Sequence, residues 1–413
     1  MMNLSPQIFP LLAFGLLFQC CTSSVDSSDD MKPDPEPTIL QPEWEVFQRS
    51  PENNGNAEAW GLDIHSEKIY WAVSQSMSGS QMDIYLHQYN LDGSQNWVEE
   101  IVSNPYTDQA YFLTLTDSIA YIGGRTCTES FGIQGCDALI AKANAANGNP
   151  ISETSWDQGF GYEEVDGIVP QPSGLLVSGW SYGENTGMDL FLQKYDHNSN
   201  LQWTETWSSP GVRDDHQDGH IIVDNSHVFL AGLYDGSPGL GWNGQSLLMK
   251  VDKNSGALAD SVTFGRKDAW VNAENALGTA TDGEFLYVTG YTTPSANNWD
   301  IFVAKYDKDL NQIWYTTWGG DDTESARSLV LDSSGQIYVA GTTISYGEGG
   351  FEVVLLKLDP SGTVQWYRTW GGPEDDNAFD IQLHHGFVYI TGRTNSFHPN
   401  GKNEAFLISE EIN

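Results

Sequence analysis

The chain has 413 residues, with 56 Asp plus Glu against 18 Lys plus Arg, so its formal net charge is −38 at pH 7. Nucleic-acid binding depends on neutralising phosphates with basic side chains, so this charge excludes nucleic acid as a partner. The 42 glycines and 15 tryptophans fit a secreted β protein. Such acidity either keeps a protein soluble or attracts cations and basic partners, and the composition leaves both open.

A short apolar run at residues 8–18 lies near the start of the chain and is followed by Cys20 and Cys21. The run is too short to span a bilayer and suits the core of a signal peptide, which we expect over residues 1–19. Leu17, three residues before Cys20, resembles the lipobox of bacterial lipoproteins. This resemblance implies lipidation at Cys20, with Cys21 as the alternative. An ordinary secretory signal with incidental cysteines is the other interpretation.

Residues 20–42 have no hydrophobic periodicity and are rich in Ser, Asp, Pro and Glu. Low hydrophobicity and like charges keep such a segment disordered, so we expect a tether here. Its Ser/Asp-rich part, residues 23–30, resembles the surface-export segment of Bacteroidetes lipoproteins. The resemblance implies a lipid anchor in the bacterial outer membrane, with the protein exposed at the cell surface.

Four short apolar runs define a unit near the C-terminus, at residues 328–331, 337–342, 353–358 and 364–370. Each run has the length of a strand and is rich in aliphatic, β-branched or aromatic residues. Turn residues separate the runs, from Asp332 to Gly335 and from Asp359 to Gly362. Four strands in a meander cannot bury both faces alone, so the unit needs copies of itself.

The copies are present along the chain. The second run recurs as aromatic or aliphatic residues that mostly end in glycine, at residues 70–73, 121–124, 176–179, 229–232, 287–290, 338–341 and 389–392. Seven units of roughly 50 residues, without a helical pattern, predict an all-β fold. We expect a seven-bladed β-propeller of four-stranded antiparallel blades over residues 43–413, and a monomer.

The two ends of the chain predict how the ring closes. The last unit stops after its third strand, and residues 43–47 supply an unused strand at the start. An N-terminal strand that completes the last blade would leave no open sheet edge at the junction. Tryptophans four residues apart in the outermost strands, such as Trp314 and Trp318, share one strand face and are expected to pack between blades.

The units resemble the bacterial SBBP-type β-propeller repeats of cell-surface and secreted proteins. The sixth unit carries the pattern most fully, in Gly319, Gly320, Ala326, Asp332, Gly335, Tyr338, Val339, Gly341, Thr342, Lys357, Asp359 and Gly362. The resemblance implies a propeller fold and a surface location. It implies no activity.

Cys127 and Cys136 flank the loop between the second and third strands of the second unit. Because a hairpin-like loop brings its ends together and an exported protein meets an oxidising compartment, we expect a disulfide. No second Cys or His pair accompanies them, which disfavours zinc.

An acidic residue precedes the innermost strand of every unit, on the face with the long loops. These residues are Glu58, Asp108, Asp166, Asp218, Glu274, Glu324 and Asp376. One interpretation is a repeated structural carboxylate that accepts backbone N–H groups. The other is an acidic ring around the channel mouth that holds Ca²⁺ or a cationic ligand, and the pattern predicts no other cofactor.

Long-loop aromatics complete the candidate ligand site, in which Trp242, Trp299 and Tyr346 stack on a ligand. Carboxylates from the same face would accept its hydrogen bonds; they are Asp218, Glu324 and Asp376. The chain contains no catalytic motif of the H-E-x-x-H, G-x-S-x-G or phosphate-loop kind. We therefore expect a binding or scaffolding module for a glycan, a protein or a cation. The alternatives are an extracellular polysaccharide hydrolase or lyase that uses carboxylates at the channel mouth, and a purely structural surface protein.

Overall fold

The computed structural model describes residues 38–51, 55–78, 81–128, 135–157, 161–183, 187–208, 220–234, 244–265, 274–295 and 298–412. The chain divides into two compact units, Met1–Pro35 and Glu36–Asn413, and every described residue belongs to the second. Four predicted site residues lie outside the described ranges: Cys20, Cys21, Asp218 and Trp242.

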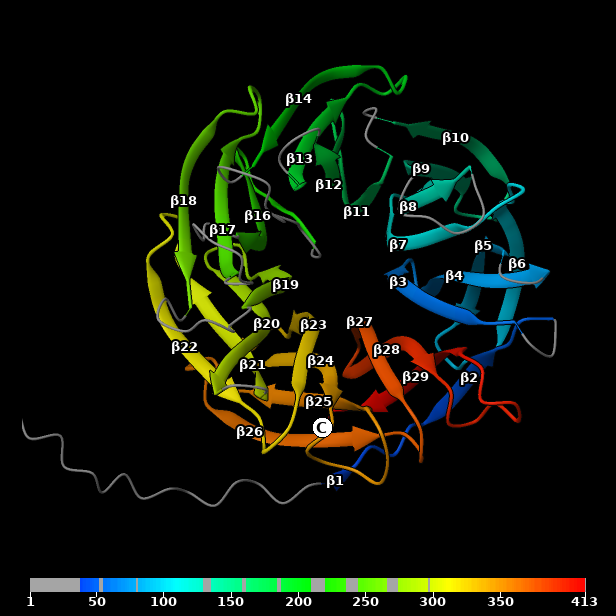
Figure 1. Ribbon diagram of the computed structural model, residues 1–413, viewed down its shortest axis with the longest axis vertical. Coiled ribbons are helices and arrows are strands. Elements are labelled where there is room, and N and C mark those ends of the chain that lie inside the picture. The colour runs from blue at the N-terminus through cyan, green and yellow to red at the C-terminus, as the bar shows by residue number, and fades with distance from the viewer. Residues whose placement is uncertain are drawn as a thin grey trace, which may run out of the picture. The chain divides into compact units, whose positions relative to one another are not determined.

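The described residues form seven sheets in a ring, and each blade has four antiparallel strands from the channel outward (Figure 1). The predicted all-β, seven-bladed propeller is confirmed. Blades one to three comprise β3 (Ala57–His65), β4 (Lys68–Ser78), β5 (Gln81–Asn90) and β6 (Gln95–Val102); β7 (Asp108–Leu115), β8 (Ile119–Cys127), β9 (Cys136–Asn144) and β10 (Pro150–Trp156); and β11 (Glu163–Gln171), β12 (Gly174–Gly183), β13 (Gly187–Tyr195) and β14 (Leu201–Trp207).

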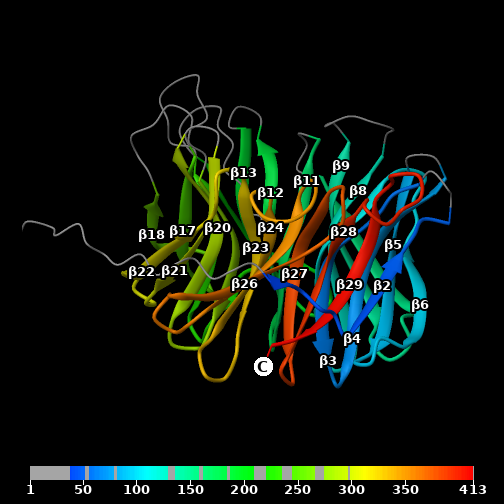
Figure 2. The same ribbon diagram turned by 90° about the horizontal axis from the view of Figure 1, so that it is seen from below.

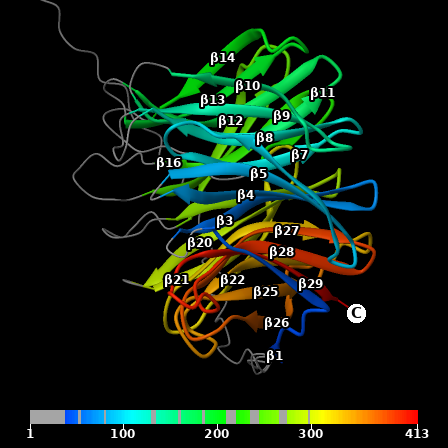
Figure 3. The same cartoon turned by 90° about the vertical axis from the view of Figure 1, so that its right-hand side faces the viewer.

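The remaining blades follow in chain order around the ring (Figure 1). Seen from the side, the C-terminal strands, drawn in red, lie beside β3 and β4 of blade one, drawn in blue (Figure 3). They comprise β15 (Ile222–Val223), β16 (His227–Tyr234), β17 (Gln245–Asp252) and β18 (Leu258–Phe264); β19 (Asn275–Thr281), β20 (Leu286–Ser295), β21 (Asn298–Tyr306) and β22 (Gln312–Trp318); β23 (Glu324–Leu331), β24 (Ile337–Thr343), β25 (Glu352–Leu358) and β26 (Val364–Trp370); and β27 (Asp376–His384), β28 (Phe387–Thr394) and β29 (Glu404–Glu411).

The N-terminal strand closes the ring. β2 (Trp44–Gln48) pairs antiparallel with β29 and becomes the fourth strand of blade seven, as predicted. A shorter strand, β1 (Thr38–Ile39), pairs in parallel with β26 at the outer edge of blade six. Leu40, between the two strands, is buried at the junction of blades six and seven. The N-terminal segment therefore contacts blades six and seven before the chain enters blade one.

Apolar packing between blades holds the ring together. Seven clusters of buried side chains fill the junctions, each drawn from two neighbouring blades. Successive residues of a strand point to opposite faces of its sheet, so one strand serves two junctions. Tyr338 and Ala340 pack toward blade seven, whereas Ile337 and Val339 pack toward blade five.

Tryptophans of the outer strands pack against turn glycines of the next blade, which confirms the predicted packing between blades for Trp314. Gly362 has a φ of 86°, and a Cβ added to it would lie 2.7 Å from the Trp314 ring. Trp203 contacts Gly256 in the same way, with a closest distance of 3.0 Å to such a Cβ. Each glycine is required both by its backbone conformation and by the ring above it.

The strands run between two faces of the ring (Figure 2). We call the face with the first-to-second-strand turns the turn face, and the opposite face, where the innermost strands begin, the loop face. On the loop face Cys127 and Cys136 are paired opposite each other on β8 and β9 and form a disulfide, as predicted. Within the described ranges, nothing helical has the length and apolar character to span a bilayer.

Candidate functional site

The predicted carboxylates at the start of the innermost strands are buried and hold local loops. Glu324 accepts hydrogen bonds from the backbone N–H of Gly320 at 2.7 Å and from the Thr343 hydroxyl at 2.8 Å. Asp376 accepts the N–H of Gly372 at 2.7 Å and the Ser396 hydroxyl at 2.8 Å. This geometry favours the structural interpretation of the acidic ring.

Asp108 and Glu274 occupy the same position in their blades. Asp108 accepts the N–H of Asn104 at 2.8 Å, and Glu274 accepts the Thr292 hydroxyl at 2.5 Å. Burial raises the pKa of Asp108 and of Asp376 above the usual value. The role of these carboxylates in binding a ligand or a cation stays a prediction.

Two members of the predicted ring occupy other positions. In blade three Glu163 starts the innermost strand and pairs with Ser181, whereas Asp166 lies three residues further along β11. In blade one, Ala57 is the first residue of the innermost strand, and Glu58 is the second. In some units the acidic residue lies one position before the repeated small residue, and in others it lies two positions before it. This difference of one position decides to which side of the strand the acidic side chain points.

A β-bulge in the innermost strands produces the candidate site. Pairing of β7 with β8 jumps from Ala110 to Phe112, so Tyr111 is left unpaired. The same shift lies between Ala326 and Ser328 in β23. A bulge re-aims the side chain of its extra residue. The bulged residues with side chains at the channel cavity are Trp60, Tyr111, Asp166, Arg327 and Phe379.

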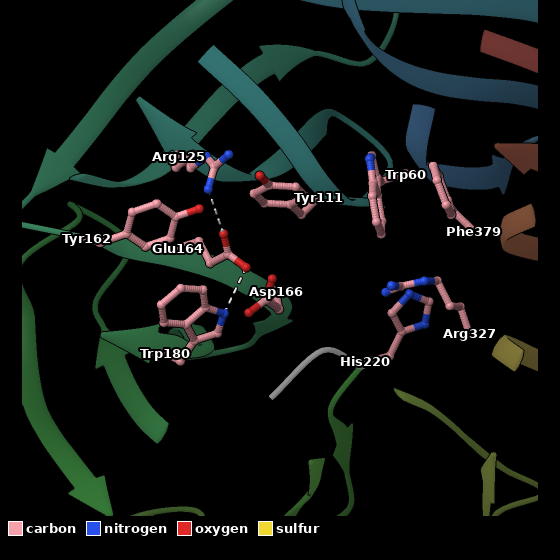
Figure 4. A pocket seen from close by; sticks show the side chains of 10 residues that line it. All are labelled: Trp60, Tyr111, Arg125, Tyr162, Glu164, Asp166, Trp180, His220, Arg327 and Phe379. Carbon is pink, nitrogen blue, oxygen red and sulfur yellow. Dashed lines mark hydrogen bonds and ion pairs between the residues drawn. The ribbon is translucent and has the colours of Figure 1, made fainter. Parts of the chain in front are cut away.

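These side chains meet at a cavity of about 280 Å³ in the channel (Figure 4). We call it the channel cavity. Its lining comes from several blades: Trp60, Tyr111, Arg125, Tyr162, Glu164, Asp166, Trp180, His220, Arg327 and Phe379. Arg125 near the end of β8 and Glu164 near the start of β11 place it toward the loop face.

Aromatic rings form two stacks in the channel cavity. The Trp60 and Phe379 rings stack with centroids 3.7 Å apart and an angle of 11°. The Tyr111 ring meets Trp60 edge-on at 5.6 Å. Across the cavity, Tyr162 and Trp180 stack at 4.9 Å with an angle of 16°. The stacks offer rigid apolar surface on two sides of one space.

Charged groups lie between the aromatic stacks. The Glu164 carboxylate accepts the indole N–H of Trp180 at 2.8 Å and lies 3.5 Å from the Arg125 guanidinium. The Arg125 guanidinium also lies over the Tyr162 ring, 4.7 Å from its centroid. Because Glu164 is engaged on both sides, its position in the cavity is fixed.

Arg327 has a different environment on the other side of the channel cavity. Its guanidinium lies 4.8 Å from the centroid of the Trp60 ring and 5.8 Å from that of Phe379. Among the described residues it has no ion pair and no side-chain hydrogen bond. Its N–H donors are therefore available to an acceptor inside the cavity.

Two of the three predicted loop aromatics, Trp299 and Tyr346, lie elsewhere, and Trp242 is outside the described residues. Trp299 stacks on Tyr291 with centroids 4.5 Å apart and is 38% exposed. Tyr346 packs on Trp318 at 5.2 Å and on Tyr367 at 4.9 Å. Neither Trp299 nor Tyr346 lines the channel cavity.

Most cavity residues were missed from the sequence, although a signal for them existed. The residue directly after the repeated small residue varies between units, as in Ala110-Tyr111, Ala326-Arg327 and Ala378-Phe379. A position that varies inside an otherwise regular repeat marks the place where the blades differ in chemistry.

Comparison with known proteins agrees with the geometry. Residues 333–364, which include β24 and β25, match the family described as "Domain of unknown function (DUF5122) beta-propeller". Together with the seven sheets, this match identifies the class of protein to which the chain belongs. The chain is a β-propeller repeat protein.

Over 179 residues, 40% of its length, the propeller protein is 25% identical to "Regulatory protein FlaEY" of Caulobacter vibrioides. The chain spans only 18% of the length of this relative.

Solved propellers cover most of the chain. The WD40 propeller domain of Doa1 has a TM-score of 0.50 and 10% identity, over 87% of this chain and 96% of that one. BamB from Moraxella catarrhalis has a TM-score of 0.47 and 11% identity, over 90% and 100%. The propeller domain of the trilobed protease from Pyrococcus furiosus has a TM-score of 0.49 and 10% identity, over 87% and 98%. At these identities the likeness concerns the fold alone.

Proposed function

We propose that the propeller is a binding module that takes one sugar unit of a glycan into the channel cavity. The observation that carries the proposal is the convergence of bulged residues from different blades on one space. The blades repeat in their core positions and differ at the bulge. The residues that recognise a ligand are therefore those at the bulge, where the blades differ in sequence.

The lining fits a sugar for three reasons. Trp60 and Trp180 present apolar ring surface, on which the C–H face of a sugar can pack. The Asp166 carboxylate accepts hydrogen bonds from hydroxyl groups, and the Arg327 guanidinium donates them. The volume of about 280 Å³ is just below the range of drug-sized sites, so one ring-sized group fits rather than an extended chain.

The proposed location is the cell surface. Leu17 and Cys20 support a lipoprotein signal, and the Ser/Asp-rich segment after them supports export to the outer face of the outer membrane. The repeat pattern of the sixth unit supports an SBBP-type propeller, in agreement with such a location. The tether of residues 20–42 would separate the propeller from the membrane.

A glycan array probed with the purified propeller, with and without Ca²⁺, tests the proposal. Arg327→Gln should weaken binding of a glycan found on the array by about 10- to 100-fold, as expected for a lost hydrogen bond from a charged donor. Trp299→Ala is the matched control, because this ring is exposed but lies outside the channel cavity. Loss of binding in Trp299→Ala, with Arg327→Gln unchanged, would move the site to the long loops.

The enzyme alternative has one specific observation in its favour. Glu164 and Asp166 place two carboxyl groups in the same cavity, which is the minimal set of a glycoside hydrolase. Under this alternative the propeller releases products from the bound glycan, and Asp166→Asn stops release while binding persists. Under the purely structural alternative these variants change the melting temperature, and no glycan binds.

A further inference from the structure

Two turns meet on the turn face at the junction of blades seven and one. Ser66 and Glu67 form the turn between β3 and β4, with φ values of 49° and 59°. His385 and Gly386 form the turn between β27 and β28, with φ values of 51° and 83°. Positive φ at both central residues defines the tight two-residue hairpin turn of type I′. Rigid hairpins thus hold the side chains at their tips.

Three potential metal ligands converge between these turns. The Nε2 atoms of His384 and His385 each lie 3.2 Å from the same Oε1 atom of Glu67. One ligand atom from each residue lies within 4.8 Å of the other two. The two imidazole rings are 4.0 Å apart between centroids. The three residues come from ends of the chain more than 300 positions apart, and only ring closure brings them together.

We propose that Glu67, His384 and His385 bind a divalent transition-metal ion, Zn²⁺ in the first instance. Imidazole nitrogen and carboxylate oxygen are ligands of zinc, with bond lengths of about 2.0–2.2 Å. In a tetrahedral site these lengths separate neighbouring ligand atoms by roughly 3.3 Å. The separations of 3.2 Å from Glu67 Oε1 to both Nε2 atoms match this value.

The surroundings leave the site accessible to an ion. The side chains of His385 and Glu67 are 68% and 60% exposed, and that of His384 is 25% exposed. Both histidines also border a hollow of about 580 Å³ between blades six and seven. Three protein ligands leave a fourth position for water or an external ligand. The net charge of −38 raises the local concentration of cations around the whole protein.

A bound ion would join blade seven to blade one. β2 already closes the outer edge of blade seven, and the metal would link the inner hairpins at the same junction. Because the site exists only in the closed ring, metal binding stabilises the folded state over the unfolded chain. The carboxylate-lined loop face has no imidazole pair among its described residues, so its cation preference would be for Ca²⁺ instead.

Isothermal titration of the metal-free propeller, without a polyhistidine tag, tests this site with Zn²⁺, Ni²⁺ and Ca²⁺. We expect one Zn²⁺ per chain, with a rise in melting temperature, and no competition by Ca²⁺ at this site. His385→Asn should weaken Zn²⁺ binding at least 10-fold, since Asn tolerates the positive φ and keeps the turn. Glu67→Gln should weaken it similarly.

His65→Ala is the matched control. His65 pairs with Asp117 at 3.1 Å at the neighbouring junction, and no second imidazole joins this pair among the residues that the structure describes. Zn²⁺ affinity should be unchanged in this variant. Absence of stoichiometric Zn²⁺ binding would overturn the proposal. So would binding that persists at full strength in both His385→Asn and Glu67→Gln, which would place the ion elsewhere.

Discussion

Asp380 of blade seven accepts a hydrogen bond at 3.1 Å from the backbone N–H of Leu62 in blade one, 318 positions away in the chain. The same carboxyl group accepts the Ser328 hydroxyl of blade six at 2.8 Å. One side chain therefore connects three blades at the channel wall. Burial raises the pKa of Asp380 above its usual value.

Replacing Asp380 tests this connection. Asp380→Ala leaves the buried N–H of Leu62 and the hydroxyl of Ser328 without their acceptor, and should lower the free energy of unfolding by about 1–3 kcal/mol. Asp380→Asn should cost less, because the amide oxygen can still accept. Urea denaturation of the two variants gives the comparison. Equal losses in both would show that the hydrogen bonds contribute nothing beyond packing.

The closing strand can be tested by truncation. A chain that begins at Leu40 lacks β1, which is exposed at a sheet edge, and should melt close to the full propeller. A chain that begins at residue 50 also lacks β2, which leaves β29 with an unpaired edge. The melting temperature of this shorter chain should fall several times further than that of the chain that begins at Leu40. Similar melting of the two truncated chains would contradict closure by β2.

The regular parts of this fold were visible in the sequence because they recur. The run Ile337–Thr343 is rich in β-branched residues and follows an Asp-to-Gly turn, and its copies fix both strand and blade number. The unpaired last unit likewise predicted that the N-terminal strand would close the ring. β1 could not be predicted, because two residues show no periodicity and their parallel pairing with β26 depends on the path of the chain outside the ring.

The candidate site was less visible, for two physical reasons. A bulge adds one residue to a strand, so Asp166 faces the channel cavity although its spacing suggested the position that Glu163 has. The cavity also joins residues as distant as Trp60 and Phe379, and only ring closure makes them neighbours. Recurrence reveals what every blade needs for folding, and the ligand site uses the positions that do not recur.

The proposed lipid anchor predicts the effect of a single substitution. Cys20→Ala should release the protein from the membrane fraction or block its maturation, since lipidation requires the thiol. Cys21→Ala is the matched control and should leave the protein in the membrane. The reverse result would shift the lipidated residue by one position. Release by neither substitution would indicate an ordinary secretory signal.

The contact between Trp314 and Gly362 predicts a glycine substitution that harms the fold for two separable reasons. Gly362→Ala introduces a side chain at a φ of 86° and places its Cβ 2.7 Å from the indole ring. Gly283→Ala has a similar φ of 92° but meets nothing within 4 Å. Backbone strain should cost about 1 kcal/mol in both variants, and crowding about 1–3 kcal/mol more in Gly362→Ala alone. Equal unfolding free energies would show that the ring moves aside without cost.

Two partly buried carboxyl groups predict how stability depends on pH. Burial, and then the charge of Glu324 in the next blade, raises the pKa of Asp300 to about 6. Burial likewise raises the pKa of Asp63 to about 6. Between pH 4 and pH 6 the folded protein therefore holds more protons on these groups than the unfolded chain does. Their contribution to the free energy of unfolding is greatest below about pH 4 and declines as pH rises to 6 and above.

Turn aspartates act in the opposite direction and in another pH range. The Asn311 side-chain amide, followed by backbone N–H groups, holds the pKa of Asp307 below its usual value. Hydrogen bonds from Ser255 do the same for the pKa of Asp252. Their stabilising effect is lost only as pH falls below about 4. The two effects therefore fall in separate pH windows.

Asp300→Asn isolates the effect of one of these carboxyl groups. Urea denaturation at intervals from pH 4 to pH 7, with EDTA present, should show a decline in unfolding free energy that is smaller in this variant. We expect a difference of about 1–2 kcal/mol, because solvent screens this partly exposed carboxyl group and reduces the full effect of the pKa shift. Glu284→Gln is the control: it removes one negative charge from an exposed turn residue and should keep the decline of the unmodified chain. If Asp300→Asn and Glu284→Gln flatten the pH dependence equally, the decline arises from the overall negative charge rather than from the Asp300 carboxyl group.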